Sequence, residues 1–173
     1  GAALLSPRGL TGGLLHIAMH AFGKITLFFC AGAVFVATGL KNVSEMKGLG
    51  RRMPWTMGAF LFGSLSVIGL PPAGGFLSKW SLLLGTLEAG QIGFLVVLLA
   101  SSLLNAAYFL PVVYDAFFAP ATQEAARPEA GGEAPPWCLV PLVVTAALSV
   151  VLFLFPGPFL ELSRLAAAQI VGE

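Results

Sequence analysis

Charged residues are scarce in this sequence of 173 residues: aspartate, glutamate, lysine and arginine together make up 10% of it, whereas apolar residues make up 57%. Soluble domains carry about 25% charged residues, so this composition excludes a soluble globular protein and predicts an integral protein of the lipid bilayer. The formal net charge is +1, and the sequence has no basic cluster with interleaved aromatic residues. We therefore expect no binding of nucleic acid.

Cysteine and the short motifs of enzymes are also nearly absent. The two cysteines, Cys30 and Cys138, lie far apart in or beside apolar segments and form no CxxC pair. We expect small buried side chains there rather than a disulfide or a metal site. The sequence contains no nucleophile elbow, phosphate-binding loop, haem motif or dinucleotide fingerprint. It predicts no catalytic residue and no cofactor for this chain.

Long apolar runs dominate what is present, and they cover residues 11–40, 54–88, 91–118 and 137–155. A membrane-spanning helix needs about 20 residues, so these runs predict an all-α, polytopic transmembrane helix bundle with about four crossings. The sequence begins at Gly1 without a segment of the signal-peptide type. We expect it to be part of a longer protein or the product of a truncated gene.

The second apolar run is interrupted by "GLPPAGGFLSKW" (69–80). A straight helix over 54–88 would exceed about 50 Å, whereas the hydrocarbon core is about 30 Å thick. Proline lacks a backbone N–H and glycine adopts turns that other residues avoid, so we predict a broken, discontinuous helix. We favour one tilted crossing, and the alternative is two short halves that turn back. The predicted hinge comprises Gly69, Pro71, Pro72, Gly74 and Gly75.

Lys79 follows this hinge inside an apolar segment. A lysine in the membrane interior costs at least about 2.5 kcal/mol, and transporters use broken helices near the midplane to build ion sites. We therefore expect Lys79 to line a hydrated cavity, with Ser78 and Asn105 as further candidates for its lining. Ser101, Ser102 and Tyr108 add hydrogen-bonding groups near Asn105. The alternatives are a plain loop with Lys79 reaching the interface and an Asn105 that joins two helices.

Three ionisable residues in the first apolar run, His16, His20 and Lys24, are spaced by four positions. Residues four apart drift only about 40° around a helix, so the three share one stripe about 12 Å long. Histidine titrates near neutral pH, which makes the stripe a candidate proton path. The alternatives are an interfacial His16 and ordinary packing of His20 and Lys24. A metal site is not expected, because no acid or cysteine lies nearby to complete a ligand shell.

The loops and the C-terminal segment suggest an orientation in the membrane. Residues 41–53 are basic, and the positive-inside rule makes this short loop cytoplasmic. Residues 119–136, rich in Pro, Ala and Glu, predict a flexible polar loop. Residues 137–173 predict a last transmembrane helix followed by an interfacial tail, since 156–173 gathers its apolar residues near one helical face. The basic residues of the 41–53 loop are Lys41, Lys47, Arg51 and Arg52.

Two stretches together resemble a known family. They are "HIAMHAFGKITLFFCAGAV" (16–34) and "GLGRRMPWTMGAFLFGSLSVIGLPPAGGFLSKW" (48–80). A His-x-x-x-His-Ala-x-x-Lys helix, a basic loop ending in Met-Pro, and Gly-Leu-Pro-Pro with Gly-Phe-x-x-Lys occur in this order. The combination is similar to the antiporter-like membrane subunits of Mrp-type cation/proton antiporters, respiratory complex I and membrane-bound hydrogenases. The resemblance covers about 12–118, and residues 119–173 match only in type.

The resemblance implies roles for the polar residues. Lys24 resembles the mid-membrane lysine of the family's hydrophilic axis, Lys79 the ionisable residue of its broken helix, and His16 and His20 the histidines beside the first lysine. Residues 1–118 would then be the C-terminal part of the proton-conducting transmembrane domain, with the earlier half of the family's subunit absent.

The implied function is proton translocation or monovalent cation–proton antiport, with protons and sodium or potassium as the ions moved. It would take place in the cell inner membrane, within a complex of several membrane subunits. The D-type member of the Mrp antiporter is favoured here. The alternatives are a proton-pumping subunit of an NADH:quinone oxidoreductase or hydrogenase complex, and a structural membrane module that does not conduct.

Overall fold

The computed structural model describes residues 6–122 and 132–171, and all regular structure within them is helical. The all-α prediction is therefore confirmed. Two short 3₁₀ helices, η2 (Val43–Met46) and η3 (Leu49–Arg51), lie in the basic loop. The α-helices are α1 (Pro7–Thr38), α2 (Pro54–Ile68), α3 (Gly75–Glu88), α4 (Ile92–Phe118), α6 (Pro136–Leu154) and α7 (Gly157–Val171).

The longest helix, α1, is the centre of the bundle. It begins where the Ser6 side chain accepts a hydrogen bond from the Gly9 N–H at 3.1 Å, and Pro7 occupies its first turn. It ends at Gly39, whose φ is 71°. Helices α2, α3, α6 and α7 pack against α1. Three helices, α1, α4 and α6, are long and apolar enough to cross a membrane.

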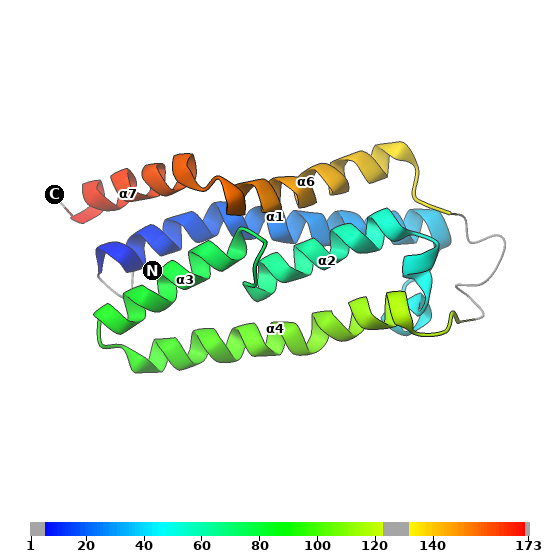
Figure 1. Cartoon of the computed structure of the whole chain (residues 1–173), viewed down its shortest axis with the longest axis horizontal. Coiled ribbons are helices and arrows are strands. Elements are labelled where there is room, and N and C mark those ends of the chain that lie inside the picture. Colours follow the sequence, from blue (N-terminus) through cyan, green and yellow to red (C-terminus); the bar gives the residue numbers. More distant parts are fainter. Residues whose placement is uncertain (1–5, 123–131, 172–173) are drawn as a thin grey trace.

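The second crossing is broken, as the prolines and glycines predict. Helices α2 and α3 are 15 and 14 residues long, each too short to span a hydrocarbon core of about 30 Å. They follow one another along α1 in the same general direction, separated by a turn (Figure 1). The favoured interpretation of one discontinuous crossing is thus confirmed, and it completes about four crossings in total.

The turn between α2 and α3 is enclosed by its neighbours. The Gly74 N–H donates a hydrogen bond to the Ser149 carbonyl of α6 at 2.9 Å. A Cβ at Gly75 would overlap the carbonyl oxygen of Ser66, so α3 can start this close to α2 only with glycine. The start of α3 is therefore fixed against both α2 and α6.

The basic loop and the segment between α4 and α6 make contacts at the end of the bundle where α2 begins and α4 ends. Lys47 pairs with Asp115 at 3.4 Å, and the Gly48 N–H donates to the Asp115 carbonyl at 3.0 Å. Glu133 caps α2: its carboxylate accepts from the Trp55 N–H at 2.6 Å and from the Thr56 hydroxyl at 2.8 Å. Half of the segment expected to be a flexible loop (119–136), residues 123–131, lies outside the described residues.

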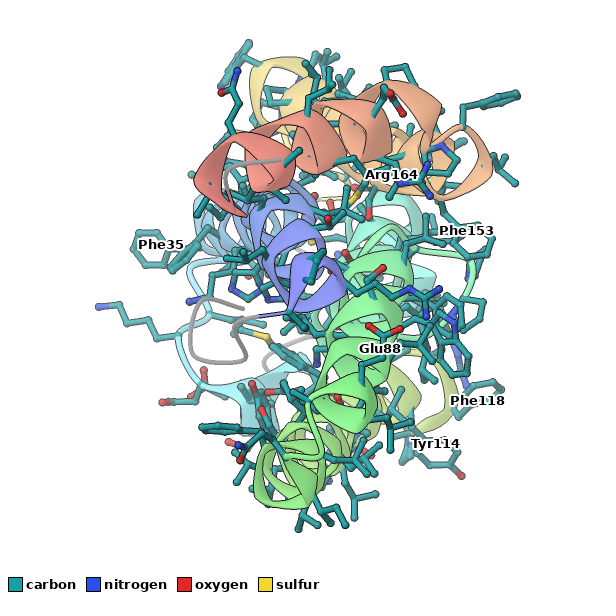
Figure 2. The ribbon with its side chains drawn as sticks, turned by 90° about the vertical axis from the view of Figure 1, so that its left-hand side faces the viewer. Phe35, Glu88, Tyr114, Phe118, Phe153 and Arg164 are labelled. Carbon is teal, nitrogen blue, oxygen red and sulfur yellow. The ribbon has the colours of Figure 1, made fainter. Side chains whose placement is uncertain are left out.

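The outer surface of the bundle is apolar. Figure 2 looks along the bundle and shows Phe35, Tyr114, Phe118 and Phe153 pointing outward from it. The most apolar stretch of α4 has no buried residue. Such an exterior is typical of contact with lipid or with other membrane helices. Helix α7 lies beside the first half of α1 (Figure 1), and its expected place at the membrane interface stays a prediction.

Candidate functional site

The ammonium group of Lys79 lies at the break between α2 and α3 and makes three hydrogen bonds. Nζ donates to the carbonyl of Val67 at 2.8 Å, to the carbonyl of Ile68 at 2.9 Å and to the Ser102 hydroxyl at 2.9 Å. The last carbonyls of a helix lack partners within it and carry the negative end of its dipole. Lys79 of α3 therefore caps the C-terminus of α2.

The glycine at the end of α2 makes room for this cap. Gly69 has a φ of 89°, which other residues rarely adopt, and a Cβ there would lie 2.5 Å from Cδ of Lys79. The Lys79 side chain can thus reach the end of α2 because residue 69 has no side chain. All five predicted hinge residues lie at this turn, from the residue that follows α2 to the first residue of α3.

Lys79 and Ser102 form the polar wall of a pocket of about 320 Å³ between the break, α3 and α4. The remaining wall is apolar and includes Phe76, Trp80 and Leu99. Neither of the two further residues expected in its lining, Ser78 and Asn105, lines this pocket. Ser78 is fully buried, and Asn105 accepts a hydrogen bond from the exposed Tyr108 hydroxyl at 2.6 Å. Ser102, one turn earlier, is the α4 residue that contacts Lys79.

A second polar line joins α1 to the start of α3. Nδ1 of His16 lies 2.9 Å from Oγ of Ser78, and the Ser78 hydroxyl donates to the Gly75 carbonyl at 3.1 Å. The rings of His16 and His20 stack with their centroids 5.0 Å apart. Both histidines are half-buried and interact electrostatically with Lys79. The structure therefore brings four of the predicted residues together around the first turn of α3.

Lys24 differs from the other predicted residues because its side chain is exposed. Within the described part of the chain it makes no hydrogen bond or ion pair, and its interaction with His20 is electrostatic. The predicted stripe on α1 thus has two half-buried histidines and one exposed lysine. The described residues contain no hydrogen-bonded link between Lys24 and Lys79.

Two buried hydroxyls beside the break have no signal in the sequence. Ser66 and Ser149 are 2% and 1% exposed, and their Oγ atoms make no hydrogen bond within the described residues. Ser66 lies against Gly75, and the Ser149 backbone receives the Gly74 N–H. A buried polar atom without a partner is rare in folded proteins and calls for a specific explanation, such as a functional role or an ordered water. The two hydroxyls place further polar groups on the side of the break that faces α1 and α6.

Comparison with known proteins gives similarities that agree with this geometry. The family model described as NADH:quinone oxidoreductase/Mrp antiporter, TM, matches residues 1–105. NADH-quinone oxidoreductase subunit N of Desulforudis audaxviator is 46% identical over 164 residues, which cover 90% of this chain and 33% of that protein. The D subunit of the Na(+)/H(+) antiporter of Alkalihalophilus pseudofirmus is 30% identical over 173 residues, covering 99% of this chain and 34% of that protein.

A solved structure shows the same arrangement of helices. A chain of the Mrp complex from Dietzia sp. DQ12-45-1b superposes with a TM-score of 0.85 at 24% identity, over 98% of this chain and 39% of that chain. At this identity the similarity establishes the fold alone. The chain spans about a third of the length of the two curated relatives described above.

Proposed function

The chain belongs to the NADH:quinone oxidoreductase/Mrp antiporter transmembrane family, and from this premise we propose that it translocates protons across the membrane as part of a larger subunit. It is a multi-pass membrane protein. The observation that carries the proposal is the position of Lys79, whose ammonium is held at a helix break inside an apolar bundle. Ionisable residues at such positions are costly, and they mark ion and proton paths.

In this proposal Lys79 is the group that holds and releases a proton. The carbonyls of Val67 and Ile68 stabilise its charge. His20, His16 and Ser78 supply a line of groups toward the same turn, through which a proton can pass in short steps. Lys79 is thereby held at the break and interacts electrostatically with the two histidines of α1.

Lys24 needs a partner from outside the described helices. The two acids within the apolar segments are already paired at helix ends, Glu88 with Arg8 and Asp115 with Lys47. An exposed cation at membrane depth calls for a carboxylate or a hydrated interface. We propose that another part of the full-length protein, or a neighbouring protein of the complex, supplies a carboxylate to Lys24.

Two versions of the function remain, and the comparisons favour one of them. The sequence motifs alone favour the D-type member of the Mrp antiporter. The 46% identity to an NADH-quinone oxidoreductase subunit N, against 30% to the D subunit of a Na(+)/H(+) antiporter, instead favours a proton-pumping subunit of a redox complex. In that version, partner subunits hold the redox cofactors. Cation–proton antiport is the second candidate, supported by the match to the antiporter protein over 99% of this chain.

Substitution of Lys79 in the assembly that contains this chain tests the proposal. Lys79→Ala removes the titratable group, and Lys79→Arg keeps the charge but does not release its proton. Both variants are expected to abolish proton transport into proteoliposomes while the complex still assembles. Lys41→Ala is the matched control, because Lys41 is exposed in the loop and lies over the Phe35 ring.

Normal proton transport by the Lys79→Arg variant would contradict the proposed role. The same preparation separates the two versions. Proton uptake driven by the redox substrate of the complex, with no response to sodium or potassium gradients, supports the redox version. Uptake driven by a sodium or potassium gradient supports antiport.

A further inference from the structure

The three hydrogen bonds of Lys79 differ in what their acceptors can do. Two acceptors are backbone carbonyls and the third is the Ser102 hydroxyl. A carbonyl oxygen only accepts hydrogen bonds, whereas a hydroxyl both donates and accepts. Ser102 is therefore the one partner of the three that can adapt to a change in the protonation state of the lysine.

From this difference we propose that Ser102 relays the proton to and from Lys79. The inference rests on the proposed function of Lys79 and names the group through which its proton passes. An ammonium has three N–H donors and no acceptor, so all three are used in the observed arrangement. A neutral amine has two N–H donors and one lone pair. Of the three partners, only Ser102 can donate to that lone pair.

Release of either of the other two ammonium protons would break a hydrogen bond to a backbone carbonyl. If the proton shared with Val67 or Ile68 left, the corresponding carbonyl at the end of α2 would lose its partner in an apolar environment. Unpaired carbonyls in the membrane interior are strongly unfavourable. Release through Ser102 leaves both carbonyl bonds in place, so α2 keeps its cap in either state of the lysine.

The step balances with one water molecule as the co-reactant. The N–H bond that points to Ser102 breaks, and its proton forms a new O–H bond with Oγ. The original O–H bond of Ser102 breaks, and that proton passes to water in the adjoining pocket. An ammonium and water become an amine and hydronium, and Ser102 ends neutral, donating to the amine. The pocket of about 320 Å³ that Lys79 and Ser102 line is far larger than one water needs.

The route through Ser102 lies on the α4 side of Lys79, whereas the line of His20, His16 and Ser78 lies on its α1 side. From α1, His16 and His20 interact electrostatically with the lysine. Helix α2 carries no ionisable residue, and α6 carries only Cys138. On α4, Tyr108, Tyr114 and Asp115 follow Ser102 toward the C-terminal end, and on α3 itself Glu88 pairs with Arg8.

An isosteric pair of substitutions tests the relay in the assembly that contains this chain. Valine and threonine have nearly the same shape, and valine has a methyl group where threonine has its hydroxyl. Ser102→Val and Ser102→Thr therefore impose the same change in size. A positioned proton-transfer group typically contributes about 10²–10⁴-fold in rate, so Ser102→Val is expected to lower the initial rate of proton transport by about a hundredfold or more. Ser102→Thr is expected to retain the rate.

The pH profile is the readout that a packing effect would not change. In Ser102→Val the ammonium loses a charge-assisted acceptor, so the pH of half-maximal transport is expected to move to lower values, whereas in Ser102→Thr it stays in place. Ser101→Val is the matched control, because Ser101 is the neighbouring residue on α4 and is exposed outside the pocket. Ser102→Ala replaces Ser102→Val if the larger side chain prevents assembly.

Two outcomes separate the relay from the proposed function. If Lys79→Ala, measured in parallel, still transports protons, the proposed function fails. If Lys79→Ala abolishes transport but Ser102→Val keeps the rate and pH profile of the unchanged protein, the relay is overturned while the proposed function stands. Equal impairment of the valine and threonine variants also overturns the relay, because size would then be the cause.

Discussion

Single side chains connect the helices of this protein at the residue scale. Lys79 belongs to α3, yet its ammonium completes the end of α2 and contacts α4 through Ser102. His16 belongs to α1 and reaches the first turn of α3 through Ser78. A change at one of these residues therefore alters the fit between helices as well as the local charge.

The three ionisable residues of α1 are expected to differ in their importance for transport. Lys24→Ala should be severely defective, because it removes the cation that we expect to meet a carboxylate outside this chain. His16→Ala should be milder, because Ser78 keeps its bond to the Gly75 carbonyl, and His20→Ala should fall between them. Proton transport in proteoliposomes, normalised to the amount of assembled protein, measures the order.

The matched control is Ile17→Ala, which truncates an exposed apolar residue on the same helix. If all three substitutions leave transport at the level of this control, the stripe on α1 has no part in proton movement.

Polar residues of the site can be predicted where they interrupt an apolar run, and their partners cannot. His16, His20, Ser78 and Lys79 stand out in the sequence, because ionisable and small polar residues inside membrane segments are rare. The sequence predicts Asn105 in the lining of the pocket where the structure has Ser102. The face that α4 turns toward α3 depends on tertiary packing, which the uniform apolar pattern of α4 does not reveal. Backbone acceptors at the end of α2 leave no residue signature at all.

At the scale of elements, the broken crossing depends on the absence of a side chain at Gly75. Gly75→Ala is expected to lower stability by about 1–3 kcal/mol, the usual cost of overpacking, because its Cβ would overlap the Ser66 carbonyl. Thermal unfolding of the purified protein in detergent measures the effect as a lower Tm.

Gly58→Ala within α2 is the matched control for Gly75→Ala. A Cβ at Gly58 meets nothing within 4 Å, and alanine is the better helix former by about 1 kcal/mol. Its Tm should therefore stay the same or rise. Equal Tm values for the two variants would contradict the tight approach of α3 to α2.

The broken element itself is predictable, because two prolines and three glycines inside an apolar run leave few other structures. The choice between one crossing and two returning halves follows from length only weakly, and the packing of both halves along α1 decides it. The cap that Glu133 places on α2 has no counterpart among the predictions. It links residues far apart in the sequence, and an acid in a segment rich in Pro, Ala and Glu gives no sign of its partner.

At the scale of the whole molecule, this chain alone in a bilayer is expected not to exchange cations for protons. Lys24 is exposed, the two acids of the apolar segments are paired at helix ends, and α4 buries nothing in its most apolar stretch. These features leave surfaces that other membrane helices would cover. The test is to reconstitute the purified chain in proteoliposomes and impose a pH gradient with sodium or potassium present.

The comparison for this test is the chain with Lys24→Ala and Lys79→Ala together, which controls for leak. Exchange by the unchanged chain above the level of the double variant would make it a self-sufficient antiporter and refute the expectation.

The two ends of α2 have a consequence for the order in which the molecule is made. Lys79, which completes the C-terminal end, is synthesised 11 residues after Ile68. Glu133, which completes the N-terminal end, is synthesised 78 residues after Trp55, when α3 and α4 already exist as sequence. The residue that completes the C-terminal end of α2 is therefore available well before the residue that completes its N-terminal end. The N-terminal end of α2 becomes complete only when the segment that leads into α6 has left the ribosome.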